Sequence, residues 1–215
     1  MSAPEPTSAT LIGTLTLAGL LSGLVLVGVF QSTKPLIAAN RAAAMEAAVT
    51  RVVPGAVKAA SYERVDGKVR ASQVAVGASS DKPMAYAGLD KAGKVVGYAI
   101  PAEGPGFMDT IRVLYGYVPG AGTIVGMEVL DSRETPGLGD KIYKDADFVA
   151  NFKKLDSKPE IVGKKKGTKS KPNEIDFITG ATISSKAIVK ILNGSAAQWA
   201  EPLAAGATPT QGKQP

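Results

Sequence analysis

The sequence predicts an α+β protein with one N-terminal transmembrane helix, followed by a domain in which helices pack on an antiparallel sheet. Three patterns lead to this prediction. An uncharged apolar run is long enough to cross a bilayer, four later segments alternate in the manner of strands, and helical periodicity returns near the C-terminus. A chain of 215 residues can therefore hold one domain of ordinary size together with its appendages.

The apolar run extends from Thr10 to Phe30 and contains 21 residues without a charge. At about 1.5 Å of rise per residue it spans roughly 31 Å, close to the hydrocarbon thickness of a membrane. A cleaved signal peptide is the alternative, but residues 1–9 carry no Lys or Arg, and the run exceeds the usual signal-peptide core of roughly 7 to 15 residues. We therefore expect an N-terminal tail at 1–9 and a transmembrane helix at 10–30.

A helix-prone segment follows the apolar run. Lys34-Pro35 begins it, and Leu36 to Val53 contains seven alanines before a stop at Pro54-Gly55. We expect a helical stalk at 31–55 that continues outward from the membrane and packs on the domain. The domain itself is expected to occupy residues 56–201.

Strand-like alternation dominates the region from Ser79 to Leu130. Turns rich in Gly, Pro or Lys separate its four runs, which are Ala85–Leu89, Val95–Ile100, Thr110–Val118 and Thr123–Leu130. These runs predict an antiparallel meander. Two helices are expected after it, a short one at Phe148–Leu155 and a second from about Ser184 to Leu192.

The composition excludes several kinds of chemistry. The chain contains no Cys and no His, so it cannot supply thiolates for an iron–sulfur cluster or structural zinc, a c-type haem motif, a Ser-His-Asp triad, or histidyl and cysteinyl flavin links. The acidic residues are scattered without an EF-hand-like spacing, so no metal site is predicted. No catalytic side chain is assigned, and any redox chemistry must come from a bound organic cofactor.

A hydroxyl-rich turn runs from Asp176 to Ser185, and the apolar residues of Ala187–Leu192 that follow it recur at helical spacing. The turn therefore lies at a helix N-terminus, where unpaired N–H groups and the helix dipole favour a phosphate. The alternative is an ordinary N-cap box, in which Thr182 or Ser184 caps the backbone and nothing binds.

This turn resembles the D-x-x-[S/T]-G-A-T signature of domains that carry FMN covalently, with Asp176 leading Thr179-Gly180-Ala181-Thr182. In that family a phosphoester joins the flavin phosphate to the last threonine, so the resemblance implies attachment at Thr182. It also implies maturation by an FMN transferase, because a threonine hydroxyl without an adjacent base is a poor nucleophile. We predict that Gly180 and Ala181 give the phosphate room, and that Ser184 and Ser185 help to satisfy its oxygens or the helix N-terminus.

A second segment resembles the E-T-P-G-L-G loop of the G subunit of Rnf-type electron transport complexes and of the related C subunit of Na+-translocating NADH:quinone oxidoreductases. Here the loop reads Glu134-Thr135-Pro136-Gly137-Leu138-Gly139, and the resemblance implies that it lies against the bound flavin. Pro136 fixes one dihedral angle, while Gly137 and Gly139 let the backbone approach a flat ring. The alternative is a plain Pro-Gly turn.

The resemblance implies a membrane-anchored electron carrier with covalent FMN, which relays electrons within an Rnf-type ferredoxin:NAD oxidoreductase complex coupled to Na+ or H+ translocation. The implied partners are the other membrane subunits, the FMN transferase and membrane lipid. Nucleic acid is not expected, because no binding motif appears.

The chain is interpreted as a carrier rather than a complete enzyme. It has no nicotinamide fingerprint and no charged residue inside its span. Its size and the lack of a large insertion favour the Rnf-type subunit over the C subunit of the quinone oxidoreductase. Two more functions fit the same features: a stand-alone anchored covalent flavoprotein, serving as a sensor or in extracellular electron transfer, and an anchored binding module without flavin.

Topology rules and the resemblance disagree on the side of the membrane. Lys34, Arg41 and Arg51 follow the span and no Lys or Arg precedes it, so the positive-inside rule favours a cytoplasmic C-terminal domain. The family places its flavin domain outside the cytoplasm. Because this charge bias is shallow, we follow the resemblance and expect a single-pass protein of the bacterial inner membrane with its flavin domain on the periplasmic side.

A basic segment lies between the two predicted helices of the domain. Lys153 to Lys171 contains eight lysines, opposed only by Asp156 and Glu160. We interpret the segment as a solvated loop, and the functional alternative is contact with anionic lipid head groups or an acidic partner subunit. The Ala/Gly/Pro/Gln-rich stretch 202–215 is expected to be a disordered tail.

Overall fold

The computed structural model describes residues 7–206. Contacts divide the chain into a first unit that ends at Arg41 and a second that begins at Ala42, so the compact domain starts inside the predicted stalk. Most of the predicted tail 1–9 lies outside the described residues, as does the C-terminal part of the predicted tail 202–215.

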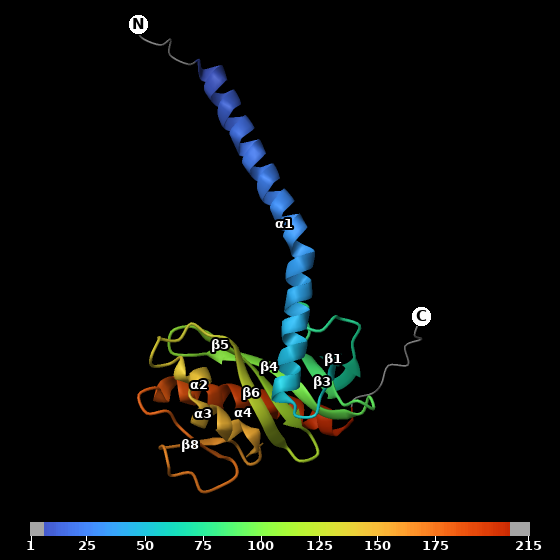
Figure 1. The fold of residues 1–215 in the computed structure, drawn as a ribbon, viewed down its shortest axis with the longest axis vertical. Coiled ribbons are helices and arrows are strands. Elements are labelled where there is room, and N and C mark those ends of the chain that lie inside the picture. The colour runs from blue at the N-terminus through green and yellow to red at the C-terminus, as the bar shows by residue number, and fades with distance from the viewer. Residues whose placement is uncertain (1–6, 207–215) are drawn as a thin grey trace. The chain divides into compact units, whose positions relative to one another are not determined.

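Helix α1 (Ser8–Val52) contains the predicted membrane span (Figure 1). It is the one helix among residues 7–206 that is long and apolar enough to cross a membrane, judged by length and composition. The predicted span and the segment predicted as a helical stalk lie in this one helix, because α1 continues through Pro35. One proline removes a single backbone donor, and the cooperative helix continues on both sides of it.

The second unit is built on a seven-stranded antiparallel sheet with the strand order β2-β1-β3-β4-β5-β6-β7. Its strands are β1 (Lys58–Val65), β2 (Lys68–Ala71), β3 (Met84–Leu89), β4 (Val95–Pro105), β5 (Thr110–Val118), β6 (Thr123–Asp131) and β7 (Leu155–Asp156). The predicted meander is confirmed as β3 to β6, in which each strand pairs with the next one along the chain. Strands β1, β2 and β7 extend the sheet beyond the prediction.

Short elements and one long helix complete the domain (Figure 1). They are α2 (Lys141–Lys144), α3 (Ala146–Ala150), the 3-10 helix η1 (Asn151–Lys153), a parallel pair of strands β8 (Val162–Lys164) and β9 (Glu174–Asp176), and α4 (Thr182–Ala204). The single helix predicted at Phe148–Leu155 is therefore replaced by α3, η1 and the start of β7.

Helix α4 is much longer than the predicted segment Ser184–Leu192. It continues to Ala204 because Ala196, Trp199 and Leu203 keep its buried face in contact with the core. The predicted tail 202–215 consequently loses its first residues to the helix.

The sheet is covered on both faces, and β5 shows how. Val113 and Tyr115 belong to the larger core, which also contains Ile188 and Leu192 of α4. Leu114, which lies between them and points to the opposite face, belongs to a second core with Val49 and Val52 from the last turns of α1.

The last turn of α1 lies very close to the sheet backbone. Added Cβ atoms at Gly116 of β5 and Gly126 of β6 would collide with the carbonyl oxygen of Val52. Only glycine permits this approach. The C-terminal end of α1 is thus an integral part of the domain.

Candidate functional site

A buried serine holds the hydroxyl-rich turn through two hydrogen bonds. Ser185 is fully buried in the first turn of α4, where its Oγ donates to the carbonyl oxygen of Ala181 at 2.9 Å and accepts from the N–H of Ile178 at 3.2 Å. Gly180 at the tip has a φ of +85°, a backbone conformation that residues with a side chain rarely adopt. These bonds fold Ile178–Ala181 back onto the helix start.

Thr182 is the first residue of α4, and its side chain is exposed. The N-cap position is Ala181, which offers no side-chain cap, and the Thr182 hydroxyl makes no hydrogen bond within residues 7–206. The alternative of an ordinary N-cap box at Thr182 or Ser184 is therefore wrong, because neither side chain caps the helix. The Thr182 hydroxyl is therefore exposed and unpartnered, among residues 7–206, at a helix N-terminus.

Glu134 joins the predicted flavin loop to two other segments. Its carboxylate is only 5% exposed. Oε1 accepts from the backbone N–H groups of Phe107 at 2.8 Å and Met108 at 2.9 Å, and Oε2 accepts from the hydroxyl of Ser184. An added Cβ at Gly139 would lie 2.7 Å from Oε2, so the glycine leaves the space that the carboxylate fills.

Two hydrogen bonds and one ion pair close the loop that follows Glu134. The carbonyl oxygen of Thr135 accepts from the N–H groups of Leu138 at 3.1 Å and Asp140 at 3.3 Å. The Asp140 carboxylate pairs with the Lys144 ammonium at 2.7 Å. This ammonium, followed by the N–H of Gly137, holds the pKa of Asp140 below its usual value.

The loop and the turn meet around one cavity of about 310 Å³. The lining residues are Phe107, Glu134, Thr135, Leu138, Gly139, Gly180, Ala181, Thr182, Ile183 and Ser184. Three apolar side chains are well exposed at this cavity, namely Phe107 at 58%, Leu138 at 49% and Ile183 at 57%. We call these three side chains the apolar rim. Apolar surface of this kind beside an exposed hydroxyl suits a flat aromatic ligand.

The structure brings together only part of the predicted site. Pro136, Gly137 and Thr179 are exposed but do not line this cavity. Ser184 and Ser185 are buried with their hydroxyls engaged by Glu134 and by the turn, so a contact with a phosphate stays a prediction for them.

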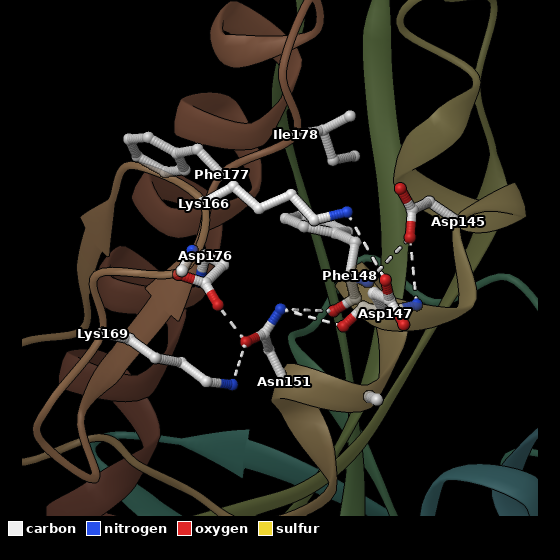
Figure 2. A pocket seen from close by; sticks show the side chains of 11 residues that line it. Asp145, Asp147, Phe148, Asn151, Lys166, Lys169, Asp176, Phe177 and Ile178 are labelled. Carbon is white, nitrogen blue, oxygen red and sulfur yellow. Dashed lines mark hydrogen bonds and ion pairs between the residues drawn. The ribbon is translucent and has the colours of Figure 1, made fainter.

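Asp176 lies away from Thr182, in the wall of a different cavity of about 360 Å³ (Figure 2). Its Oδ1 accepts from the N–H of Gly167 at 2.9 Å, and its own N–H donates to Oδ1 of Asn151 at 3.3 Å. The first residue of the predicted flavin motif therefore anchors the basic segment.

Sequence reasoning missed Phe107 and Ile183 as cavity residues. Phe107 follows the Gly104-Pro105-Gly106 stretch, which reads as a strand break, and its proximity to Glu134 arises only when β4 and β5 pair. Ile183 reads as the first apolar position of a helix face, although 57% of it is exposed. The signal that could have identified Ile183 is its position directly after Thr182, the last residue of the motif.

Comparisons with known proteins identify the family to which the chain belongs. The model of the FMN-binding domain family matches residues 106–196, which include the loop, the turn and most of α4. The chain is 30% identical over 176 residues to the G subunit of the proton-translocating ferredoxin:NAD(+) oxidoreductase complex of Clostridium ljungdahlii, covering 82% of this chain and 83% of the relative. The chain belongs to the G-subunit family of these complexes.

Two further proteins support this family assignment and the fold. The G subunit of the Na(+)-translocating ferredoxin:NAD(+) oxidoreductase complex of Acetobacterium woodii is 36% identical to this chain over 146 residues, covering 64% of the chain and 67% of the relative. The C subunit of the Na(+)-translocating NADH-quinone reductase of Parabacteroides distasonis has the same fold as this G-subunit chain. Its TM-score is 0.60 at 19% identity, over 76% of this chain and 92% of that one.

Proposed function

We propose that this G-subunit chain is a membrane-anchored electron carrier of an ion-translocating ferredoxin:NAD oxidoreductase complex, with FMN esterified to Thr182. One observation carries the proposal. The Thr182 hydroxyl is exposed and unpartnered at the first position of α4, in a cavity with an apolar rim.

The residues around the cavity fit the two ends of FMN. The free N–H groups at the start of α4 and the positive end of its dipole suit a phosphate on Thr182. The apolar rim of Phe107, Leu138 and Ile183 suits the isoalloxazine ring. The bound FMN would supply the one- and two-electron redox chemistry that a chain without Cys or His lacks.

The remaining cavity residues hold this arrangement. Glu134 joins Phe107 and Met108 to Ser184, so the rim and the attachment turn keep one relative position. Ser185 holds the turn itself. Rigid support of this kind keeps a tethered ring at a constant distance from a neighbouring redox centre.

A covalent bond has a physical advantage at this location. We infer a single-pass protein of the inner membrane whose flavin domain faces the periplasm, where no FMN pool replaces lost cofactor. A noncovalent FMN with micromolar affinity, about 8 kcal/mol, would be lost by dilution there. The esterification itself is assigned to an FMN transferase, because the cavity offers no His or Lys as a base beside Thr182. Anchoring in membrane lipid through α1 belongs to the same proposal.

Coexpression of the full chain with an FMN transferase tests the attachment. We expect a band that fluoresces under ultraviolet light on a denaturing gel, at 22.0 kDa plus the mass of FMN less one water. Thr182→Ala should abolish the fluorescence, whereas the matched control Thr110→Ala, at another exposed threonine, should retain it. A fluorescent Thr182→Ala band would reject the attachment site, and a dark wild-type band would reject the covalent model.

A further inference from the structure

Positive charge is concentrated in one segment of the domain. Residues 153–171 contain eight lysines and two acidic residues, a difference that equals the whole formal charge of +6. The rest of the chain therefore carries seventeen basic and seventeen acidic side chains. Such a concentration of one sign differs from the mixed charges of an ordinary solvated surface.

Hydrogen bonds hold the backbone of this basic segment in place. Glu174 is buried, and its Oε2 accepts from the N–H groups of Ser170 at 2.8 Å and Lys171 at 3.2 Å, while Oε1 pairs with the Lys164 ammonium at 3.4 Å. The Asp176 carboxylate holds Gly167. Glu174 and Asp176 thus hold the loop backbone.

Asn151 ties the segment to the neighbouring helices (Figure 2). Its amide nitrogen donates to the carbonyl oxygens of Asp147 and Phe148, and its Oδ1 accepts from the Lys169 ammonium at 2.7 Å. The same Oδ1 accepts from the N–H of Asp176. The basic segment is therefore connected to the strand that leads into the flavin turn.

The lysine side chains surround a hollow of about 370 Å³ beside the one in Figure 2. Its wall includes Lys153, Lys154, Lys169 and Lys171. Together with exposed Lys165 we call these residues the lysine platform. Within residues 7–206, the ammonium groups of Lys153, Lys154, Lys165 and Lys171 make no hydrogen bond or ion pair.

We propose that the lysine platform docks a carboxylate-rich surface of another protein subunit. This proposal rests on membership in an oxidoreductase complex, as proposed above, but not on the flavin. Charge complementarity is the argument, because the platform ammonium groups make no ion pair within residues 7–206, while Glu174 and Asp176 are engaged by the loop backbone. Lysine charges at an interface steer association and set orientation.

The surroundings of the platform favour a protein surface over a lipid bilayer. Val162, at 41%, is the only well-exposed large apolar side chain between residues 153 and 176, so the segment lacks the apolar anchors of an interfacial membrane element. A hollow also admits protruding carboxylates better than a flat bilayer does.

The test compares two variants of the full chain with equal charge. In the platform variant, Lys153, Lys154, Lys165 and Lys171 become Gln. In the control variant, Lys58, Lys68, Lys91 and Lys94, all exposed and distant in sequence, become Gln. Each variant is added to the complex purified without this subunit, in nanodiscs of phosphatidylcholine, and its affinity is measured at several NaCl concentrations.

We expect binding of the platform variant to be on the order of tenfold weaker at low salt, with a shallower salt dependence. The control variant should change the affinity by less than about threefold. A carbodiimide should also cross-link platform lysines to Asp or Glu of another subunit. Equal affinities of the two variants, with no such cross-link, would overturn the proposal.

Two further outcomes are distinguishable. A loss of affinity that appears only when phosphatidylglycerol is added to the nanodiscs would assign the lysines to lipid and would also overturn the proposal. Failure of wild type to join the complex would reject the proposed function instead, whereas a fluorescent, complex-bound platform variant with wild-type affinity would reject only this inference. Unchanged circular dichroism confirms that both variants fold.

Discussion

The carboxylate of Glu134 accepts a hydrogen bond from the hydroxyl of Ser184, a residue fifty positions later in the chain. Both side chains are buried at the cavity that holds Thr182. The same carboxylate accepts from Phe107 and Met108, and it makes no ion pair within residues 7–206. A buried acceptor with only neutral donors therefore connects three segments of the cavity wall.

Glu134→Gln should leave flavin attachment intact and raise the midpoint potential of the bound FMN. The amide oxygen can still accept from Phe107 and Met108, and the amide nitrogen can donate to Ser184. Only the negative charge is lost, which favours the electron-rich reduced flavin. We expect a rise on the order of 30 mV, equivalent to about 1.4 kcal/mol for a two-electron couple, in a spectroelectrochemical titration. A fully loaded variant with the wild-type potential would contradict this.

Gly116→Ala should lower the free energy of unfolding by about 1–3 kcal/mol, because its Cβ would collide with the carbonyl oxygen of Val52. Gly120→Ala is the matched control, since an added Cβ there meets nothing within 4 Å. Trp199 is buried and is the only tryptophan, so its fluorescence reports unfolding in detergent. Equal stability of both variants would show that α1 does not approach the sheet this closely.

Replacing Leu138 of the apolar rim should expose the flavin without unfolding the domain. Leu138 is 49% exposed, so Leu138→Ala should change stability by less than about 1 kcal/mol. If the ring rests on the rim, iodide should quench its fluorescence more strongly in this variant than in wild type. The control is Val57→Ala, at a similarly exposed apolar residue outside the cavity. Identical quenching in all three proteins would place the ring elsewhere.

Glu174 should make the anchored basic segment sensitive to acid. The N–H of Ser170, supported by the N–H of Lys171 and by Lys164, lowers the pKa of Glu174 from its ordinary value of 4.5. Its contribution to stability is therefore complete above that value and is lost as pH falls through the lower folded-state pKa. Between pH 7 and pH 3, urea midpoints of wild type should fall more steeply than those of Glu174→Gln. Parallel pH profiles would refute this linkage.

Local patterns are sufficient to predict the four strands of the meander and the turn at the start of α4. Turns and alternation mark β3 to β6, and β5 and β6 begin at the predicted residues. Strand β1 is not predicted because Ser61 is its only fully buried residue, so its sequence lacks an apolar alternation. The pattern assigns the hydroxyls of Ser184 and Ser185 to the phosphate oxygens or the helix N-terminus. It cannot reveal that Ser184 donates to Glu134, because tertiary structure brings these two residues together.

Charge composition alone cannot distinguish a solvated loop from an anchored one. The lysines of 153–171 are visible in the sequence, but the buried position of Glu174 is not. Likewise, the length of α4 depends on Trp199 and Leu203, which reach the core only once the sheet has formed. Long-range packing decides each of these features.

Because the sheet is covered on both faces, few positions in its middle strands should tolerate substitution. In a sheet with one solvent-exposed face, every second residue of a strand tolerates substitution. In β3, however, five consecutive residues are buried. Strand β4, which pairs with β3, and β5, which pairs with β4, are similarly enclosed through their middles. Substitutions that accumulate over time should therefore collect in β1, β2 and the loops, and saturation mutagenesis of the domain should find the least tolerance along three adjacent strands.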